Sequence, residues 1–213
     1  MDRLRVTEIF YSLQGESRTV GWPTVFVRLT GCPLRCVYCD TAYAFTGGHK
    51  MAIGEIVDEV GSYRPRYVTV TGGEPLAQRG CLALLDALVE EGYEVSLETG
   101  GALDVSEVNP KVVKVLDLKT PSSGEEGKNR YRNLDFIDRK DQLKFVIMNE
   151  ADYQWAKAKM EEHGLPDRCE VLFSPAMGTQ EPAELAEKIL RDRLPVRFQV
   201  QLHKILWGDT PGR

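Results

Sequence analysis

The chain is organised around one stretch, Gly31-Cys-Pro-Leu-Arg-Cys-Val-Tyr-Cys-Asp40. Three of its five cysteines, Cys32, Cys36 and Cys39, fall here in a C-x3-C-x2-C pattern. Spacings this short let one loop wrap a single metal centre, because the thiolate sulfurs converge while the backbone turns between them. Three cysteines leave the fourth iron of an iron–sulfur cube without a protein ligand, so a small molecule can bind it. The stretch therefore predicts a metal loop with one open coordination position.

A structural zinc site is the alternative interpretation of the same loop. Three cysteines and a histidine close a zinc tetrahedron, and His49 follows the last cysteine at a short distance. Zinc ribbons, however, usually pair two short C-x2-C arms across a longer insert, and this sequence has no second arm. The spacing favours iron–sulfur over zinc.

Length and composition are those of an ordinary soluble protein. With 213 residues, 42% of them hydrophobic, the chain is long enough for one sizeable core, so a single domain over 1–213 is expected. The formal net charge is −5 and the lysines and arginines are scattered, which argues against nucleic acid as a partner. Cys81 and Cys169 lie in apolar contexts and are expected to be buried core thiols.

The N-terminal sequence MDRLRVTEIF lacks the apolar core of a signal peptide, and no apolar run approaches membrane-spanning length. A cytoplasmic protein without membrane contact is therefore expected, and in that compartment cysteines stay reduced.

Segments with strand and helix patterns alternate along the chain. Strands are expected at 3–13, 24–30, 67–71, 94–98, 112–118, 143–148, 171–173 and 197–202. Helices are expected at 52–63, 80–91, 151–163 and 182–193. The charged stretch 124–132 is expected to be a mobile loop. This alternation predicts an α/β fold with a mostly parallel sheet and right-handed crossovers.

Polar motifs follow the carboxyl ends of the expected strands, the edge at which (β/α) barrels build their active sites. These motifs occupy 32–39, 72–75, 99–101, 119–123, 174–177 and 203–204. A complete eight-unit barrel needs about 250 residues, and this chain is shorter. A partial, splayed (β/α) barrel is therefore expected.

Several of these motifs have both a structural and a functional interpretation. Gly72-Gly-Glu-Pro75 is either a tight turn or a place where bare backbone at Gly73 meets a ligand while Glu74 accepts from an ammonium group. Asp117-Leu-Lys119 and Ser174-Pro-Ala-Met177 are either ordinary loops or supports for the ribose or carboxylate of a cofactor.

Arg28 lies in an apolar strand, where an unpaired guanidinium is costly, so it needs an anion. Either Glu16 supplies a structural salt bridge, or Arg28 clamps a substrate carboxylate. Gln14 offers an acceptor and donors suited to the edge of a heterocycle. Asp40-Thr41 either caps a turn or supplies oxygen ligands for a magnesium ion.

The cysteine spacing, with Tyr38 before the last cysteine, resembles the signature of the radical S-adenosylmethionine (SAM) superfamily. The resemblance implies a 4Fe-4S cluster whose open iron is chelated by the methionine part of SAM. One electron from that cluster cleaves the sulfonium to give a 5′-deoxyadenosyl radical. It also implies that Tyr38 lies by the adenine and that the Gly-Gly-Glu motif contacts the amino group of the cofactor.

Over essentially its whole length, from Phe10 onward, the chain resembles the 7-carboxy-7-deazaguanine synthase family of the queuosine and deazapurine pathway. The resemblance rests on LQGES, Arg28, C-x3-C-x2-C-D-T, GGEP, DLKTP and the terminal QLHK. It implies a lyase that abstracts hydrogen from 6-carboxy-5,6,7,8-tetrahydropterin and contracts the ring with loss of ammonia, using a 4Fe-4S cluster, SAM and Mg²⁺. The implied partners are the pterin, an electron donor such as flavodoxin or ferredoxin, and a second copy in a homodimer.

The resemblance also assigns residues. Expected to hold the cluster and SAM are Cys32, Cys36, Cys39, Tyr38, Asp40, Gly73, Glu74, Asp117, Lys119, Ser174, Pro175, Ala176 and Met177. Expected to contact the pterin are Leu13, Gln14, Gly15, Glu16, Arg28, Thr71 and His203. Thr41 is expected to ligate magnesium. The family also uses its C-terminus at the substrate. Which residue of the tail 208–213 would make that contact is not assigned by the resemblance.

Two other functions remain open on the sequence. A small activating enzyme of the same superfamily would generate a glycyl radical on a partner protein, and it should lack the LQGES and Arg28 pocket. A zinc-stabilised binding module would be colourless when isolated without air, whereas an iron–sulfur protein would be brown.

Overall fold

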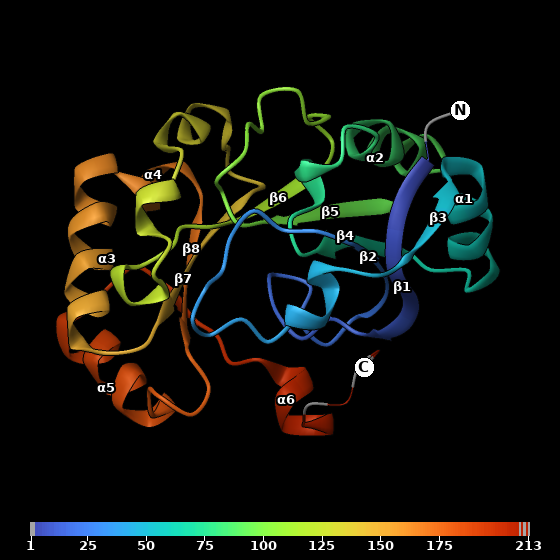
Figure 1. Cartoon of the computed structure of the whole chain (residues 1–213). Coiled ribbons are helices and arrows are strands. Elements are labelled where there is room, and N and C mark those ends of the chain that lie inside the picture. The colour runs from blue at the N-terminus through green and yellow to red at the C-terminus, as the bar shows by residue number, and fades with distance from the viewer. Residues whose placement is uncertain (1–2, 209, 211, 213) are drawn as a thin grey trace.

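The computed structural model describes residues 3–208, 210 and 212, which form a nine-stranded sheet with the order β3-β1-β2-β4-β5-β6-β7-β8-β9 (Figure 1). The strands are β1 (Arg3–Leu13), β2 (Pro23–Leu29), β3 (His49–Ala52), β4 (Tyr67–Gly72), β5 (Glu94–Thr99), β6 (Val113–Asp117), β7 (Gln142–Ile147), β8 (Glu170–Pro175) and β9 (Arg197–Phe198). Every pairing from β2 to β9 is parallel, and β1 is antiparallel to β2 and β3. The predicted mostly parallel α/β sheet is confirmed, and it is open rather than closed into a barrel.

Helices connect the parallel strands, as the sequence pattern predicts. They are α1 (Ile53–Ser62), α2 (Cys81–Glu90), α3 (Glu150–His163), α4 (Leu165–Arg168), α5 (Pro182–Asp192) and α6 (Leu202–Trp207). In Figure 1, α1 and α2 lie at one end of the sheet and α3, α4 and α5 at the other, whereas α6 lies apart from both groups. In the described part of the chain, no helix is both long and apolar enough to cross a membrane.

The central strands alternate apolar and polar side chains, as in YVTVTG of β4 and EVSLET of β5. The apolar members are buried in the core, and polar members such as Thr71 and Glu98 line a cavity. At one end of the sheet, Phe145 of β7 packs edge-on against Phe173 of β8, with ring centroids 5.6 Å apart. Tyr153 of α3 meets the same Phe173 ring at 6.0 Å. Cys81 and Cys169 are buried in the core, as predicted. This packing fixes the ends of β6, β7 and β8, which carry part of the site.

An irregularity in β1 decides the direction of one important side chain. The β1–β2 register shifts between Val6 and Glu8, so that Glu8 pairs directly with Arg28. An extra residue of this kind reverses the alternation of side chains along a strand. The shift therefore brings the Glu8 carboxylate to the same side of the sheet as the Arg28 guanidinium.

Three sequence predictions about local structure are wrong. The predicted strand 197–202 ends after two residues, and Leu202 instead begins α6, with its amide donating to Gly15 O at 3.0 Å. His203 and Lys204 consequently lie on a helix rather than past a strand. Strand β3 was not predicted; it pairs with β1 at the edge of the sheet.

The third wrong prediction concerns the stretch 124–132, expected to be a mobile loop. It contains a 3-10 helix at Glu126–Lys128 and the start of another at Tyr131–Phe136. The Asn129 side chain accepts from Lys119 N at 2.9 Å and donates to Lys119 O at 2.8 Å. These bonds tie the charged stretch to the end of β6.

A buried ion pair joins the amino ends of β6 and β7, at the edge opposite the polar motifs. Asp141 is 0% exposed, accepts from Lys114 N at 2.8 Å and lies 3.0 Å from Lys114 Nζ. It also lies 3.0 Å from Lys140 Nζ, which bridges to Asp138 on the surface. Burial lowers the pKa of Lys114, although Asp141 opposes the shift.

We predict that Asp141→Ala lowers the free energy of unfolding by about 3–5 kcal/mol, because it leaves the buried Lys114 ammonium unpaired. Asp138→Ala is the control: its carboxylate is 62% exposed, so the loss should stay below about 1 kcal/mol. Urea unfolding followed by circular dichroism measures both. Equal losses in the two variants would contradict a structural role for the buried pair.

Candidate functional site

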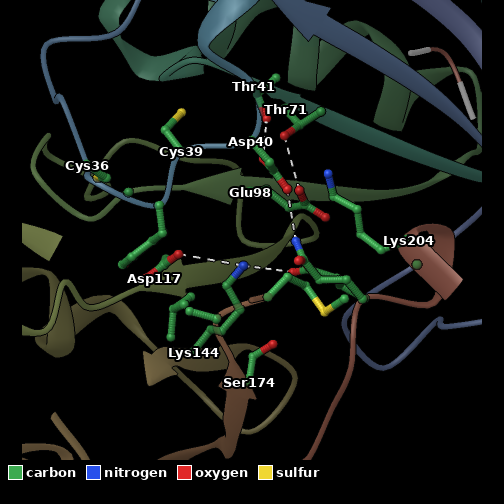
Figure 2. Close-up of a pocket in the computed structure, with 18 of the residues that line it drawn as sticks. Cys36, Cys39, Asp40, Thr41, Thr71, Glu98, Asp117, Lys144, Ser174 and Lys204 are labelled. Carbon is green, nitrogen blue, oxygen red and sulfur yellow. Dashed lines mark hydrogen bonds and ion pairs between the residues drawn. The ribbon is translucent and has the colours of Figure 1, made fainter. Parts of the chain in front are cut away.

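One cavity of about 750 Å³ lies at the carboxyl ends of the parallel strands. Its walls come from the turn after β1, the cysteine loop, the ends of β4 to β8 and helix α6. Every site residue predicted from the sequence lines this cavity except Glu74. Figure 2 shows labelled members from the cysteine loop, from the strand ends and from α6 around the same space.

The cysteine loop supplies three free thiols to the cavity wall. Cys32, Cys36 and Cys39 are each partly exposed, and burial raises the pKa of Cys32 and Cys36. In the described residues, no three His, Cys, Asp or Glu side chains are yet close enough to hold a metal. Binding a cluster therefore requires the three thiols of this loop to turn toward one another. His49, the fourth ligand of the zinc alternative, begins β3 and does not line the cavity.

Gly73 brings the end of β4 against the cysteine loop. A Cβ atom at Gly73 would lie 2.4 Å from Gly31 O and 2.7 Å from the Cβ of Cys32, both far inside contact distance. Gly73 lines the cavity, so the absence of a side chain leaves its backbone open to a ligand beside the cysteines.

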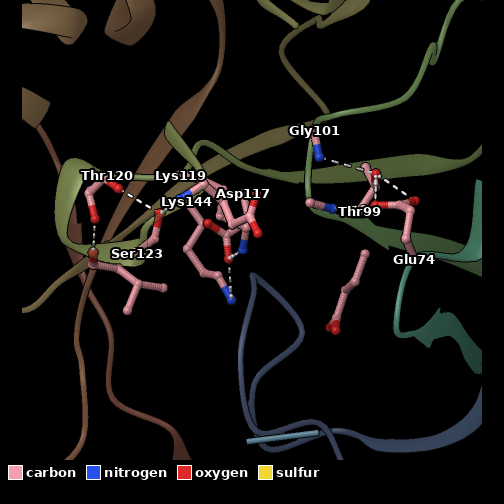
Figure 3. Close-up of polar contacts among 12 residues, drawn as sticks. Glu74, Thr99, Gly101, Asp117, Lys119, Thr120, Ser123 and Lys144 are labelled. Carbon is pink, nitrogen blue, oxygen red and sulfur yellow. Dashed lines mark hydrogen bonds and ion pairs between the residues drawn. The ribbon is translucent and has the colours of Figure 1, made fainter. Parts of the chain in front are cut away.

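The Glu74 carboxylate is buried and forms hydrogen bonds within the protein. It is 0% exposed and accepts from Thr99 Oγ1, from Gly100 N at 2.7 Å and from Leu76 N at 3.1 Å (Figure 3). Burial raises its pKa, although these bonds oppose the shift. These bonds tie β4 to β5 through the Glu74 carboxylate. The expected contact between Glu74 and the amino group of a cofactor stays a prediction, because a carboxylate has acceptor capacity beyond these three bonds.

Alternating charges form a buried chain across the floor of the cavity. Lys119 Nζ lies 3.0 Å from Asp117 Oδ2, and Lys144 Nζ lies 3.6 Å from the same oxygen (Figures 2 and 3). Lys144 Nζ also lies 2.7 Å from Glu16 Oε2. Burial raises the pKa of Asp117, but Lys119 and Lys144 outweigh it, so that the pKa is held below its usual value. Asp117 Oδ1 is buried and has no hydrogen-bond partner within the described residues.

A second polar group lies beside this chain of charges. Gln14 Nε2 donates to Thr69 Oγ1 at 3.0 Å and approaches Glu98 Oε1 at 3.4 Å, and its oxygen accepts from Glu16 N at 3.1 Å. Thr71 Oγ1 donates to Glu98 Oε2 at 3.1 Å. Burial and then the charge of Glu16 raise the pKa of Glu98. The Gln14 amide thus already has partners on both ends: its nitrogen contacts Thr69 and Glu98, and its oxygen holds the backbone of Glu16.

Arg28 has a protein anion, but not the predicted one. Its Nε donates to Glu8 Oε1 at 2.7 Å, whereas Glu16 pairs with Lys144. The guanidinium carbon lies 5.7 Å from the Phe10 ring centroid and 5.8 Å from that of Tyr43. Arg28 also lines the cavity. Glu8 and the two rings therefore hold its guanidinium in place at the cavity wall.

Residues before and within α6 close the remaining side. Gln201 Nε2 donates to Glu16 Oε1 and to Asp40 Oδ2, both at 2.9 Å, and Thr41 Oγ1 donates to Asp40 Oδ1 at 2.7 Å. Burial raises the pKa of Asp40, but the hydrogen bonds from Thr41 and Gln201 oppose it, and the net pKa lies below its usual value.

His203 lies directly on the turn that carries Glu16. A Cβ atom at Gly15 would come within 2.3 Å of His203 Nδ1, so only glycine fits under the imidazole. Burial lowers the pKa of His203, which keeps the ring neutral at pH 7. Gly208 also lines the cavity. The remaining tail prediction falls in part on residues 209, 211 and 213, which lie outside the described residues.

The sequence analysis missed Lys144, Gln201 and Glu8. Lys144 carried a usable signal, because it is the one charge in the run LKFVIM, as Arg28 is in TVFVRLT. Gln201 had no signal, since its strand assignment was wrong. Glu8 depends on a register shift in β1 that strand alternation does not reveal.

Comparison with known proteins identifies relatives of this chain. The model of the Radical SAM superfamily matches residues 26–118. The 7-carboxy-7-deazaguanine synthase of Chlorobaculum tepidum is 48% identical over 213 residues, covering 98% of this chain and 97% of that protein. The enzyme of the same name from Koribacter versatilis is 44% identical, covering 98% of this chain and 100% of its own length.

A solved structure supports the fold. The crystal structure of QueE from Escherichia coli superposes with a TM-score of 0.77 at 21% identity, covering 94% of this chain and 95% of that one. The predicted radical SAM type of open α/β sheet is thereby confirmed.

We predict that replacing Cys32, Cys36 or Cys39 by alanine reduces cluster iron to background and abolishes cleavage of SAM, because each removes one of three thiolate ligands. Cys81→Ala and Cys169→Ala are matched controls, since both thiols are buried away from the cavity. Iron and sulfide content after anaerobic purification measures the outcome. A full cluster in Cys36→Ala would disprove the ligand assignment.

Proposed function

The chain belongs to the 7-carboxy-7-deazaguanine synthase family of the radical SAM superfamily, and we propose that the cavity at the carboxyl ends of the strands holds cluster, SAM and pterin together. The protein is a lyase that converts 6-carboxy-5,6,7,8-tetrahydropterin to 7-carboxy-7-deazaguanine by hydrogen abstraction, ring contraction and loss of ammonia. It uses a 4Fe-4S cluster and SAM. The observation that carries the site assignment is that the cysteine loop, the LQGE turn and Arg28 line the same cavity.

The cofactor side of the cavity suits the cluster and SAM. The donor set is three thiols on one loop, and the Gly73 backbone lies against that loop where any side chain would collide. Tyr38 OH and Asp117 Oδ1 are buried polar atoms without partners in the described part of the chain, so each has bonding capacity left for a ligand. When bound, the cluster supplies the electron that cleaves SAM to a 5′-deoxyadenosyl radical.

Individual residues on this side have distinct proposed roles. Asp117, kept ionised by Lys119 and Lys144, accepts from a ribose hydroxyl through Oδ1. Tyr38 lies by the adenine, and the Lys119 ammonium is 5.7 Å from the Tyr38 ring centroid. Ser174, Pro175, Ala176 and Met177 form the far wall at the end of β8.

The substrate side lies between the LQGE turn and Arg28. Arg28, with its Nε already bonded to Glu8, offers its outer nitrogens to the carboxylate of the pterin. Leu13, Gly15, Glu16, Thr71 and His203 surround the ring system. Neutral His203 carries one donor and one acceptor.

We propose that magnesium binds at Thr41, next to Asp40. Asp40 is ionised and lies beside Thr41 Oγ1, so the pair offers the hard oxygen donors that Mg²⁺ prefers. One hydroxyl and one carboxylate make a weak site, which the substrate carboxylate would complete.

We further propose a cytoplasmic location, because the thiol ligands must stay reduced, and a flavodoxin- or ferredoxin-type protein as the reductant. The relatives, matched over nearly their full length, make a glycyl-radical activating enzyme or a zinc module poor alternatives.

The direct test is turnover. Anaerobically reconstituted protein is incubated with SAM, dithionite, magnesium and 6-carboxy-5,6,7,8-tetrahydropterin, and products are identified by mass spectrometry. We expect 7-carboxy-7-deazaguanine in excess over 5′-deoxyadenosine, because pterin and product differ only by ammonia and the abstracted hydrogen must therefore return. Formation of 5′-deoxyadenosine with no deazaguanine would reject the proposed substrate while leaving the radical chemistry intact.

We predict that Arg28→Lys weakens pterin binding by on the order of 2–3 kcal/mol, because lysine keeps the charge but loses the planar fork. Cleavage of SAM without substrate should change little. Arg66→Lys is the control. Arg66 forms an exposed ion pair with Glu94 at the amino ends of β4 and β5, the edge of the sheet opposite the cavity. If Arg28→Lys bound the pterin like wild type, Arg28 would serve only the Glu8 ion pair.

We predict that Thr41→Val slows formation of 7-carboxy-7-deazaguanine and raises the magnesium concentration needed for half-maximal rate, because it removes one oxygen ligand. Cleavage of SAM, followed in parallel, should persist. Thr46→Val is the matched control. Thr41 and Thr46 flank the same 3-10 helix, Ala42–Phe45, but Thr46 does not line the cavity. An unchanged magnesium response in Thr41→Val would show that Thr41 only bonds Asp40.

A further inference from the structure

Lys144 lies where the substrate side and the cofactor side of the cavity meet. It projects from the middle of β7, and its Cα pairs in register with that of Asp117 on β6. Its ammonium lies 2.7 Å from Glu16 and 3.6 Å from Asp117 (Figure 2). Its side chain is 16% exposed, so its charge is poorly solvated and depends on these carboxylates.

The carboxylates of Glu16 and Asp117 differ in their partners other than Lys144. Asp117 has a second cation, Lys119, at 3.0 Å. Glu16 has the neutral amide of Gln201 at 2.9 Å, and Lys144 is the cation that forms an ion pair with it in the described residues. Removing the Lys144 ammonium therefore leaves Asp117 paired with Lys119 but takes from Glu16 the ion pair that it forms in the described residues, and Arg28 remains as a cation that lowers the pKa of Glu98.

Glu98 makes that loss more severe. Burial and the Glu16 charge already raise the pKa of Glu98, and Lys144 opposes that rise. Two poorly solvated carboxylates side by side cannot both stay ionised without a cation. The charged groups that face this pair from the surrounding elements are Arg28, Asp40, Asp117, Lys119, His203 and Lys204.

We propose that Lys144 is a positioning residue that holds the Glu16 carboxylate in the cavity, through their 2.7 Å ion pair, to accept from N–H donors of the heterocycle. The inference rests on the proposed function, because it takes the ligand beside Glu16 to be the pterin. Each Glu16 oxygen retains lone-pair capacity beyond its bond to Lys144 or Gln201. An aminopyrimidinone ring presents adjacent N–H donors, which a carboxylate matches and a protonated carboxyl does not.

The asymmetry gives a paired prediction. Lys144→Met should weaken pterin binding by about tenfold or more, while SAM binding changes by less than about threefold, because Asp117 keeps Lys119. Lys119→Met should show the opposite pattern, since Lys119 contacts Asp117 and the Tyr38 ring. A general loosening of the cavity would weaken both ligands in both variants.

The pH dependence provides a readout that a merely structural lysine would not change. In Lys144→Met the pKa of Glu98 should rise further, because Lys144 is one of the charges that lower it. Pterin affinity should then rise from about pH 7 to about pH 9 as Glu98 loses its proton. In wild type, the Lys144 ammonium stays charged throughout, because its three carboxylate neighbours raise its pKa despite the opposing effect of burial. Burial lowers the pKa of His203, so that its titration lies below this range.

The experiment is calorimetric titration of the anaerobically reconstituted holoenzyme with 6-carboxy-5,6,7,8-tetrahydropterin and, separately, with SAM, at several pH values. Wild type, Lys144→Met, Lys144→Arg and Lys119→Met are compared, with folding checked by circular dichroism. Lys144→Arg keeps the positive charge but changes the shape of the side chain, so its pterin affinity should fall without acquiring the pH dependence. If Lys144→Met does not fold, the result for Lys144→Arg tests the inference.

Wild-type-like pterin binding by Lys144→Met, or the same pH dependence in Lys144→Arg as in Lys144→Met, would overturn the inference. Equal weakening of pterin and SAM by Lys144→Met would do the same. Failure of the wild-type protein to bind the pterin would instead reject the proposed function, so the two failures are distinguishable.

Discussion

The parallel hydrogen-bond ladder from β2 to β8 is the constraint on which the site depends. Because these strands run in one direction, all their carboxyl ends reach one edge of the sheet. Glycine then allows the cysteine loop to lie directly on that edge. A Cβ atom at Gly72, whose φ is +151°, would lie 2.1 Å from Leu29 O, and one at Gly73 would collide with Gly31. Only a strand end without side chains can bring the loop and the ligand-facing backbone so close together.

Electrostatics organises what the ladder brings together. Glu16, Glu98 and Asp117 come from three separate strands or turns, and Lys119 and Lys144 are interleaved with them. In a poorly solvated cavity such groups are costly unless they are paired, so their mutual positions are strongly coupled. The same low polarity strengthens their hold on a ligand that offers complementary donors. The charged chain thus serves the fold and the chemistry with the same contacts.

The sequence predicts most of the fold because periodicity and motif position are local properties. The cysteine loop follows β2 directly and the GGEP turn follows β4, so their positions after parallel strands place Arg28, Cys32 and Gly73 at one edge. Pairing between distant side chains is not local, and there the predictions fail. Arg28 was matched with Glu16, yet a register shift in β1 gives it Glu8, and Glu16 pairs with Lys144, which is 128 residues away. Likewise, nothing in the motif around Glu74 reveals that its carboxylate also accepts from Thr99 and Gly100.

Helix α6 shows why the far end of the chain matters to a site defined near its beginning. Gln201 bonds Glu16 across 185 positions and Asp40 across 161, and Leu202 N donates to Gly15 O. The proposed substrate turn and the proposed magnesium loop are thereby joined through one amide group. Because that amide is neutral, it orients both carboxylates without cancelling their charge, whereas a lysine there would neutralise the magnesium side. The division is physically consistent: Lys144 compensates charge where N–H donors are to be bound, and Gln201 preserves charge where a cation is to be bound.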